Sequence, residues 1–220
     1  MHHNAHQAAI ARVVATLALL LGLPSTAGAL PLISEVFYDA VGSDDGKSFV
    51  ELYGPPGTDL TGLFVEGING SGGAVTHSVA LSGPIPADGF FVLADGLADG
   101  TTLVEDADLI GSFDFQNGPD SIVLRSGEQR LDAVGYGVFA AGDVFAGEGS
   151  PAPAAPAGAS LARTFADIDT DDNAADFAVL AVPTPGTGGL APVPEPGTLM
   201  LLGLGLGGVG LCGRRRHLRA

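Results

Sequence analysis

Two short runs decide the fold: Leu32-Ile33-Ser34-Glu35-Val36-Phe37-Tyr38 and Lys47-Ser48-Phe49-Val50-Glu51-Leu52-Tyr53. Gly42 follows the first run and Gly54-Pro55-Pro56-Gly57 follows the second. Such residues supply the positive or preset φ that turns need, so each run predicts a β-strand. Because neighbouring side chains on a strand face opposite ways, Val50 and Leu52 share one face. We expect that face to be the interior.

Six more runs of this kind follow, and Gly, Pro, Asp and Asn cluster between them. Many short strands with frequent turn signals are typical of a β-sandwich or barrel. No helical periodicity of useful length occurs between Leu30 and Pro192. Val144 to Ala159, rich in Ala, Pro and Gly, predicts a long irregular loop. The six runs are Gly62 to Glu66, Val75 to Leu81, Phe90 to Leu93, Ser121 to Arg125, Leu131 to Tyr136, and Phe177 to Val182.

In order, these segments resemble the lamin-tail domain, and the resemblance spans nearly all of residues 30–192. One departure is Gly54, where that family usually has an asparagine. The resemblance implies an all-β, immunoglobulin-like β-sandwich, found in bacterial secreted and surface proteins, alone or beside hydrolases and nucleases. It is carried by Leu32 to Val36, Phe49 to Tyr53, Leu60 to Gly62, Gly89 to Leu93, Asn117 to Leu124, Leu131 to Gly137, Ala159 to Arg163, Asp176-Phe177, and Pro183 to Gly186.

The N-terminus has the pattern of a secretory signal peptide. Arg12 precedes an apolar stretch from Val13 to Leu23, and small residues, Ala27 and Ala29, stand where signal peptidase reads the chain. The pattern predicts a signal helix within residues 1–29 and cleavage between Ala29 and Leu30.

The C-terminus has three parts in a fixed order: Val193-Pro194-Glu195-Pro196, an apolar run from Thr198 to Cys212, and Arg214-Arg215-Arg216. The run is shorter than the roughly 20 residues of an ordinary transmembrane helix. The arginines predict a basic end that stays cytoplasmic. Residues 193–220 resemble the PEP-CTERM sorting signal of Gram-negative bacteria. That resemblance implies cutting by an exosortase at or near the motif, followed by release or re-anchoring; the alternative is a permanent anchor.

Residues 30–192 therefore form the expected domain between two processing segments. They hold four basic and 24 acidic residues, a net charge of −20. Such a surface repels nucleic acid, suits a soluble extracellular domain and attracts divalent cations. The single cysteine, Cys212, lies in the C-terminal segment, so a disulfide or a zinc cluster within the domain is excluded.

Catalytic groups are sparse in this domain. Its one histidine, His77, stands on a predicted strand without a nucleophile elbow nearby, which favours an ordinary surface residue. Glu35 and Glu51 stand mid-strand in the first two runs, and we expect their carboxylates to accept hydrogen bonds from the backbone or from arginine. The alternative is a glycosidase-like pair, which would require the two strands to be neighbours. We therefore expect no enzymatic activity.

The densest acidic run lies just before the last predicted strand. Carboxylates at alternate positions of a loop can converge on Ca²⁺, which takes six to eight oxygen ligands. The run is not an EF-hand, because position six from Asp167 is Asp172 and position twelve is Ala178. The alternative is an acidic turn whose side chains bond their own backbone. The candidate calcium ligands are Asp167, Asp169, Asp171, Asp172, Asn173 and Asp176.

These features together predict an exported, exosortase-processed protein of the cell surface or extracellular matrix that acts as a non-enzymatic binding or structural module. The alternative is a small secreted hydrolase with metal- or carboxylate-based chemistry. The expected partners are signal peptidase, an exosortase, exopolysaccharide or surface proteins, and, transiently, the inner membrane. Nucleic acid is not among them.

Overall fold

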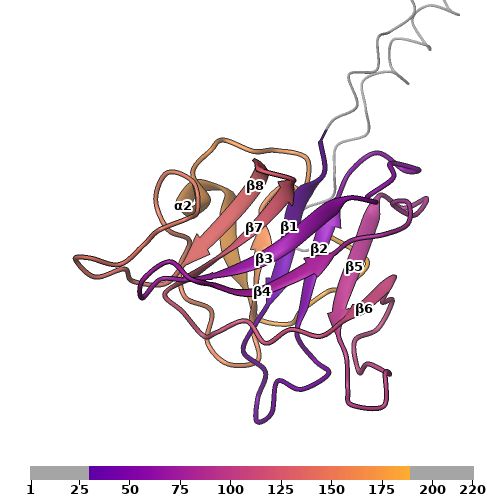
Figure 1. Cartoon of the computed structure of the whole chain (residues 1–220), viewed down its shortest axis with the longest axis horizontal. Coiled ribbons are helices and arrows are strands. Elements are labelled where there is room, and N and C mark those ends of the chain that lie inside the picture. Colours follow the sequence, from indigo (N-terminus) through magenta and orange to yellow (C-terminus); the bar gives the residue numbers. More distant parts are fainter. Residues whose placement is uncertain (1–29, 189–220) are drawn as a thin grey trace, which may run out of the picture. The chain divides into compact units, whose positions relative to one another are not determined.

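The computed structural model describes residues 30–188, which form ten strands and one short helix (Figure 1). The predicted signal helix and the predicted transmembrane run from Thr198 to Cys212 lie outside the described residues. Within residues 30–188, none of the helical structure is long and apolar enough to span a bilayer.

Six strands form the first sheet, in the order β10-β9-β1-β2-β5-β6. All neighbours in it are antiparallel except β5 and β6, which are parallel. Figure 1 shows β1 and β2 at the middle of the molecule. The strands are β1 (Leu32–Phe37), β2 (Phe49–Tyr53), β5 (Phe90–Asp95), β6 (Leu109–Gly111), β9 (Ser160–Arg163) and β10 (Phe177–Leu180).

Four strands form the second sheet, in the order β4-β3-β7-β8, and all its neighbours are antiparallel. The strands are β3 (Leu63–Asn69), β4 (Val75–Ala80), β7 (Asp120–Ser126) and β8 (Gln129–Tyr136). One apolar cluster takes side chains from both sheets, so the core lies between them. The all-β sandwich predicted from the sequence is confirmed at this level.

The predicted inward face of β2 is also confirmed. Val50 and Leu52 are fully buried in the core cluster. At one end of the core, the rings of Tyr38 and Tyr136 stack with centroids 4.1 Å apart, and the Tyr38 hydroxyl accepts a hydrogen bond from the Ala155 N–H. This contact fixes the irregular connection between β8 and β9 against the two sheets.

Three elements were not among the eight predicted runs. β6 is only three residues long, and β9 only four, so neither gives a clear pattern in the sequence. The helix α2 (Asn173–Asp176) is a single turn begun by the side chain of Asp172, which accepts a hydrogen bond from the Ala174 N–H. The predicted irregular loop from Val144 to Ala159 is confirmed; its only ladder contact is one bridge between Ala152 and Tyr136.

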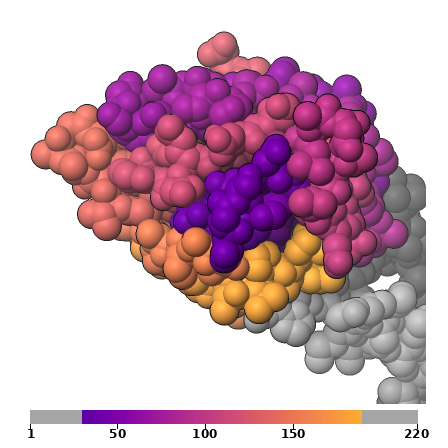
Figure 2. All heavy atoms as spheres, turned by 90° about the horizontal axis from the view of Figure 1, so that it is seen from below, coloured from indigo at the N-terminus to yellow at the C-terminus, as the bar shows by residue number. Residues whose placement is uncertain are grey.

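The outer face of β1 and β2 is covered as well. Phe49, on the face opposite Val50, is 1% exposed and packs against Phe37 with ring centroids 5.9 Å apart. Beside them run residues 183–188, which we call the strap. Figure 2 shows the early part of the domain, in indigo, next to the late part, in yellow. The strap is the last described segment before the sorting motif.

Candidate functional site

Glu35 and Glu51 lie opposite each other on β1 and β2, and both are fully buried. Glu51 accepts hydrogen bonds from the Ser34 hydroxyl (2.7 Å) and from the Gly186 N–H (2.7 Å). Glu35 accepts from the Ser160 hydroxyl (2.5 Å) and from both the N–H and the hydroxyl of Thr184 (3.0 and 2.8 Å). Two buried carboxylates therefore hold the strap.

Burial sets the protonation of this pair. It raises the pKa of Glu35, and the hydrogen bonds from Ser160 and Thr184 offset part of that rise. Burial raises the pKa of Glu51 to about 7, and the neighbouring Glu35 carboxylate raises it as well. The prediction that these positions accept backbone hydrogen bonds is confirmed. Because the strap lies over both carboxylates, a glycoside has no access to them in this structure.

A buried arginine on β9, the strand next to β1, organises a second polar cluster. Arg163 on β9 is 2% exposed, and its guanidinium lies 3.0 Å from Asp132 and 2.8 Å from Asp176. Its Nε donates to the Ile33 carbonyl, and its guanidinium stacks over the Phe177 ring at 4.6 Å. This network was not predicted from the sequence. Asp132, a charged residue within the apolar run of β8, could have indicated a buried ion pair.

The acidic run from Asp167 to Asp176 builds a turn and joins it to other parts of the chain. Asp172 caps α2 and accepts from the Ser150 N–H. Asn173 accepts from the N–H groups of Gly135 and Glu148 and donates to the Ala133 carbonyl. Asp176 bonds Arg163 and Thr170. The contacts of Asp172 with Ala174 and of Asp176 with Thr170 agree with the acidic turn that the sequence left open as the alternative, and the remaining contacts reach other segments.

The remaining candidate ligands are Asp167, Asp169 and Asp171, all exposed. Of the six candidates, Asp169 alone joins a group of three described carboxylates close enough to share an ion, and its partners are Asp132 and Glu148. Both partners lie outside the predicted run. The calcium site built from all six residues stays a prediction, because the structure does not bring those six side chains together.

The charges of Asp132 and Asp169 act on the Glu148 carboxyl. Burial, together with the nearby carboxylates of Asp132 and Asp169, raises its pKa to about 7, and Arg130 offsets part of that rise. Burial also raises the pKa of Asp132, against the opposing effect of Arg163. Nothing in the local pattern around Glu148, which lies among Gly and Ala residues, marked it as a site residue.

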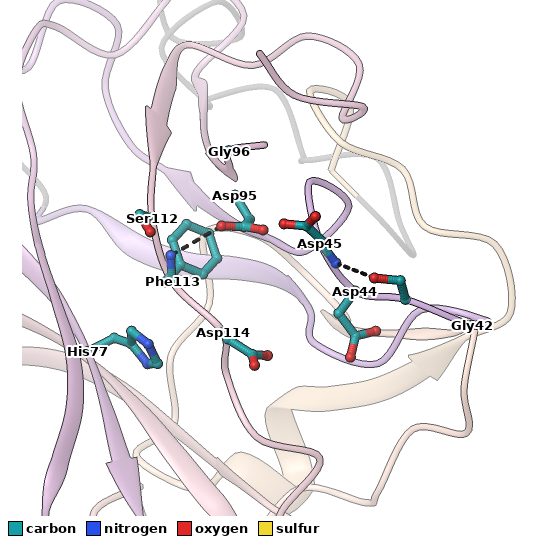
Figure 3. Close-up of a pocket in the computed structure, with 10 residues that line it drawn as sticks. Gly42, Asp44, Asp45, His77, Asp95, Gly96, Ser112, Phe113 and Asp114 are labelled. Atoms are coloured by element: carbon teal, nitrogen blue, oxygen red, sulfur yellow. Dashed lines mark hydrogen bonds between the residues drawn. The ribbon is translucent and has the colours of Figure 1, made fainter. Parts of the chain in front are cut away.

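A separate acidic cavity of about 440 Å³ opens at the far end of the sandwich (Figure 3). Four carboxylates, those of Asp44, Asp45, Asp95 and Asp114, line it together with His77. Figure 3 shows that these side chains come from separate segments, including β4, the end of β5 and the connection between β1 and β2. Asp95 is engaged, since it accepts from the N–H groups of Gly46 and Phe113. The lining favours a cationic or hydrogen-bond-donating ligand.

His77 has no serine nucleophile arranged with it in this cavity. Its Nδ1 is buried without a hydrogen-bond partner among residues 30–188, and its ring meets the Phe115 ring edge-on at 6.3 Å. A catalytic triad requires a histidine that is bonded both to a nucleophile and to an orienting carboxylate. The geometry of His77 is that of a cavity-lining residue.

Comparison with known protein families identifies a motif in one part of the chain. Residues 192–216 match the PEP-CTERM protein-sorting motif. No curated protein and no solved structure matches the chain. The matched residues include Val193 to Pro196 and Arg214 to Arg216. This motif implies recognition by an exosortase, export and processing at a membrane. The chain therefore carries a C-terminal PEP-CTERM sorting signal.

Proposed function

We propose that this protein is a surface or matrix module that works outside the cell by binding or by assembly, without catalysis. The observation that carries the proposal is the sorting motif at residues 192–216, which begins directly after a folded β-sandwich. The net charge of −20 on residues 30–192 supports an extracellular setting rather than contact with nucleic acid. The partners we propose are exopolysaccharide or other surface proteins.

We further propose that the sandwich is immunoglobulin-like and of the lamin-tail type. The eight predicted runs occur as strands in their expected order, with β9 where the resemblance places Ala159 to Arg163. The two sheets enclose one apolar core, as in a sandwich of that class. A solved structure of the exported domain with a different strand connectivity would overturn this assignment.

The strap bears on how processing works. Four residues separate Gly188 from Val193. A fully extended chain covers at most about 3.6 Å per residue, so the motif begins within about 18 Å of the folded domain. In this proposal, the exosortase acts close to an already folded sandwich, and the strap stays with the mature protein.

The proposal is tested by replacing Pro194 and Pro196 with alanine in the full chain. The expected result is uncleaved precursor that accumulates in the inner membrane. The matched control is Pro183→Ala with Pro185→Ala, which removes two prolines from the strap and leaves the motif intact; this variant should be processed like the wild type. Normal processing of the Pro194/Pro196 variant would mean that the tail is a plain anchor.

A second function, hydrolysis, is favoured by the acidic cavity with His77. The exported protein should be assayed with divalent ions on glycans, esters and nucleic acids. Turnover that is lost in His77→Gln or Asp114→Asn would replace the non-enzymatic proposal. Binding to washed cells or exopolysaccharide without turnover would support it.

A further inference from the structure

Three carboxylates from distant parts of the chain meet at one place. Asp132 lies on β8, Glu148 in the connection between β8 and β9, and Asp169 in the loop before α2. Each offers one oxygen, and these three oxygens lie within 4.8 Å of one another. Carboxylates so close together repel each other unless a positive charge lies among them.

Glu148 gives the second and independent observation. Its side chain is only 7% exposed. Its Oε2 is buried and has no hydrogen-bond partner among the described residues. Its Oε1 lies 3.8 Å from the Arg130 Nε, which is too long for a hydrogen bond. A buried carboxylate oxygen without a donor is costly, so this position favours a positively charged ligand.

The local charge balance points to a divalent occupant. The carboxylates of Asp132, Glu148, Asp169 and Asp176 face two cations, Arg163 and Arg130. The surplus is two negative charges. Arg163 contacts Asp132 and Asp169, and it is held in place because its Nε donates to the Ile33 carbonyl and its NH1 to the Ile168 carbonyl. It cannot swing over to meet Glu148 without breaking those bonds.

The donor set selects a hard cation that tolerates irregular geometry. All three groups offer oxygen, and Ca²⁺ accepts six to eight oxygens at 2.3–2.6 Å in flexible arrangements. Asp132 already accepts hydrogen bonds from Ile33, Ala133 and Arg163, so it would share an oxygen rather than donate its whole carboxylate. The side chain of Asp169 is 23% exposed, which leaves an approach for the ion and for water ligands. Mg²⁺ demands near-ideal octahedral geometry and fits this set less well.

We propose that Asp132, Glu148 and Asp169 bind one calcium ion that ties the two long connections before and after β9 to strand β8. The site does not depend on the proposed function. Its ligands differ from the run predicted from the sequence, with which it shares Asp169 alone. A weak extracellular site binds at roughly 10⁻⁴–10⁻³ M, so the relevant concentrations are millimolar.

The test uses the full chain in a nonionic detergent, with thermal unfolding followed by circular dichroism. Calcium at 10 mM should raise the melting temperature by several degrees over a chelator sample at matched ionic strength, and equilibrium dialysis should give one ion per chain. Glu148→Gln, which keeps the shape of the side chain, should abolish both effects. The matched control Asp167→Asn makes the same change of charge in the exposed acidic run and should keep both.

Three results would overturn the proposal. Magnesium that works as well as calcium would indicate general screening of charge. A calcium shift that persists in Glu148→Gln would place the ion elsewhere. No calcium shift in the wild type, together with a Glu148→Gln variant at least as stable as the wild type, would mean that a proton shared between Glu148 and Asp132 fills the gap.

Discussion

Replacing Arg163 with methionine should lower the free energy of unfolding by about 3–5 kcal/mol near pH 8. The guanidinium is fully buried, and it neutralises two carboxylates, Asp132 and Asp176, that are almost as buried. Methionine keeps most of the length and the apolar contact with Phe177. It removes the charged donor from both carboxylates and the donor of the Ile33 carbonyl, while Asp132 keeps its backbone donors and Asp176 keeps Thr170. The cost arises from these lost donors and not from a loss of packing.

The pH dependence gives a second signature. Burial raises the pKa of Asp132, and Arg163 opposes that rise. Without Arg163 the folded-state pKa of Asp132 climbs further above its unfolded value of about 3.9. Between those two values the folded state binds more protons than the unfolded state, so the stability of the variant falls as the pH rises. The difference from the wild type should therefore shrink when the pH is lowered from 8 to 5.

The assay is urea unfolding of the exported protein at several pH values. The control is Arg125→Met, because Arg125 pairs with Glu66 at 3.1 Å but its side chain is 33% exposed. A partly exposed pair of this kind, open to solvent screening, is worth about 1 kcal/mol. A loss below about 1 kcal/mol in Arg163→Met, or a deficit that does not change with pH, would refute the reasoning.

Two further predictions concern the first sheet. Leu52→Ala should cost about 2–5 kcal/mol in urea unfolding, because Leu52 is fully buried in the core; Leu103→Ala, at a 60% exposed side chain, should stay within about 0.5 kcal/mol of the wild type. Glu51, with a pKa raised to about 7, binds a proton in the folded state where the unfolded state has lost it. Its contribution to the free energy of unfolding is fully present below about pH 4.5 and is lost as the pH rises through 7. The loss is at most about 3 kcal/mol. Glu51→Gln should flatten this part of the stability profile, and an unchanged slope would assign it to another group.

The strands could be predicted where the pattern of side chains is local. Val50 and Leu52 alternate with Phe49 and Glu51, so one face of β2 could be chosen from the sequence. The environment of the other face was harder to predict, because Phe49 and Glu51 are buried as well. The strap that covers them lies more than 130 residues later in the sequence. Alternation along a strand indicates two faces, but it does not indicate what covers the second one.

The sites depended on partners distant in the sequence. Glu35 and Glu51 were identifiable as a pair because their strands are neighbours, yet their donors, Thr184 and Gly186, were not. The acidic run was identifiable as a cluster of charge. In the structure, Asp176 bonds Arg163, and Asn173 accepts from the Glu148 N–H. These contacts form because two long connections fold back on β8, and the spacing of residues in the sequence does not predict that folding.

The strap limits where the chain can be cut. Among the described residues, the donors to Glu35 and Glu51 are two serine hydroxyls and groups of the strap, and no arginine pairs with either carboxylate. A cut before Pro183 would remove the Thr184 and Gly186 donors and also the segment that covers Glu35, Glu51 and Phe49, so the outer face of β1 and β2 would be exposed to water. A cut at or near Val193 removes none of them. A sorting enzyme that acts at the motif therefore leaves the fold intact, and the strap is best understood as the end of the domain rather than as the start of the tail.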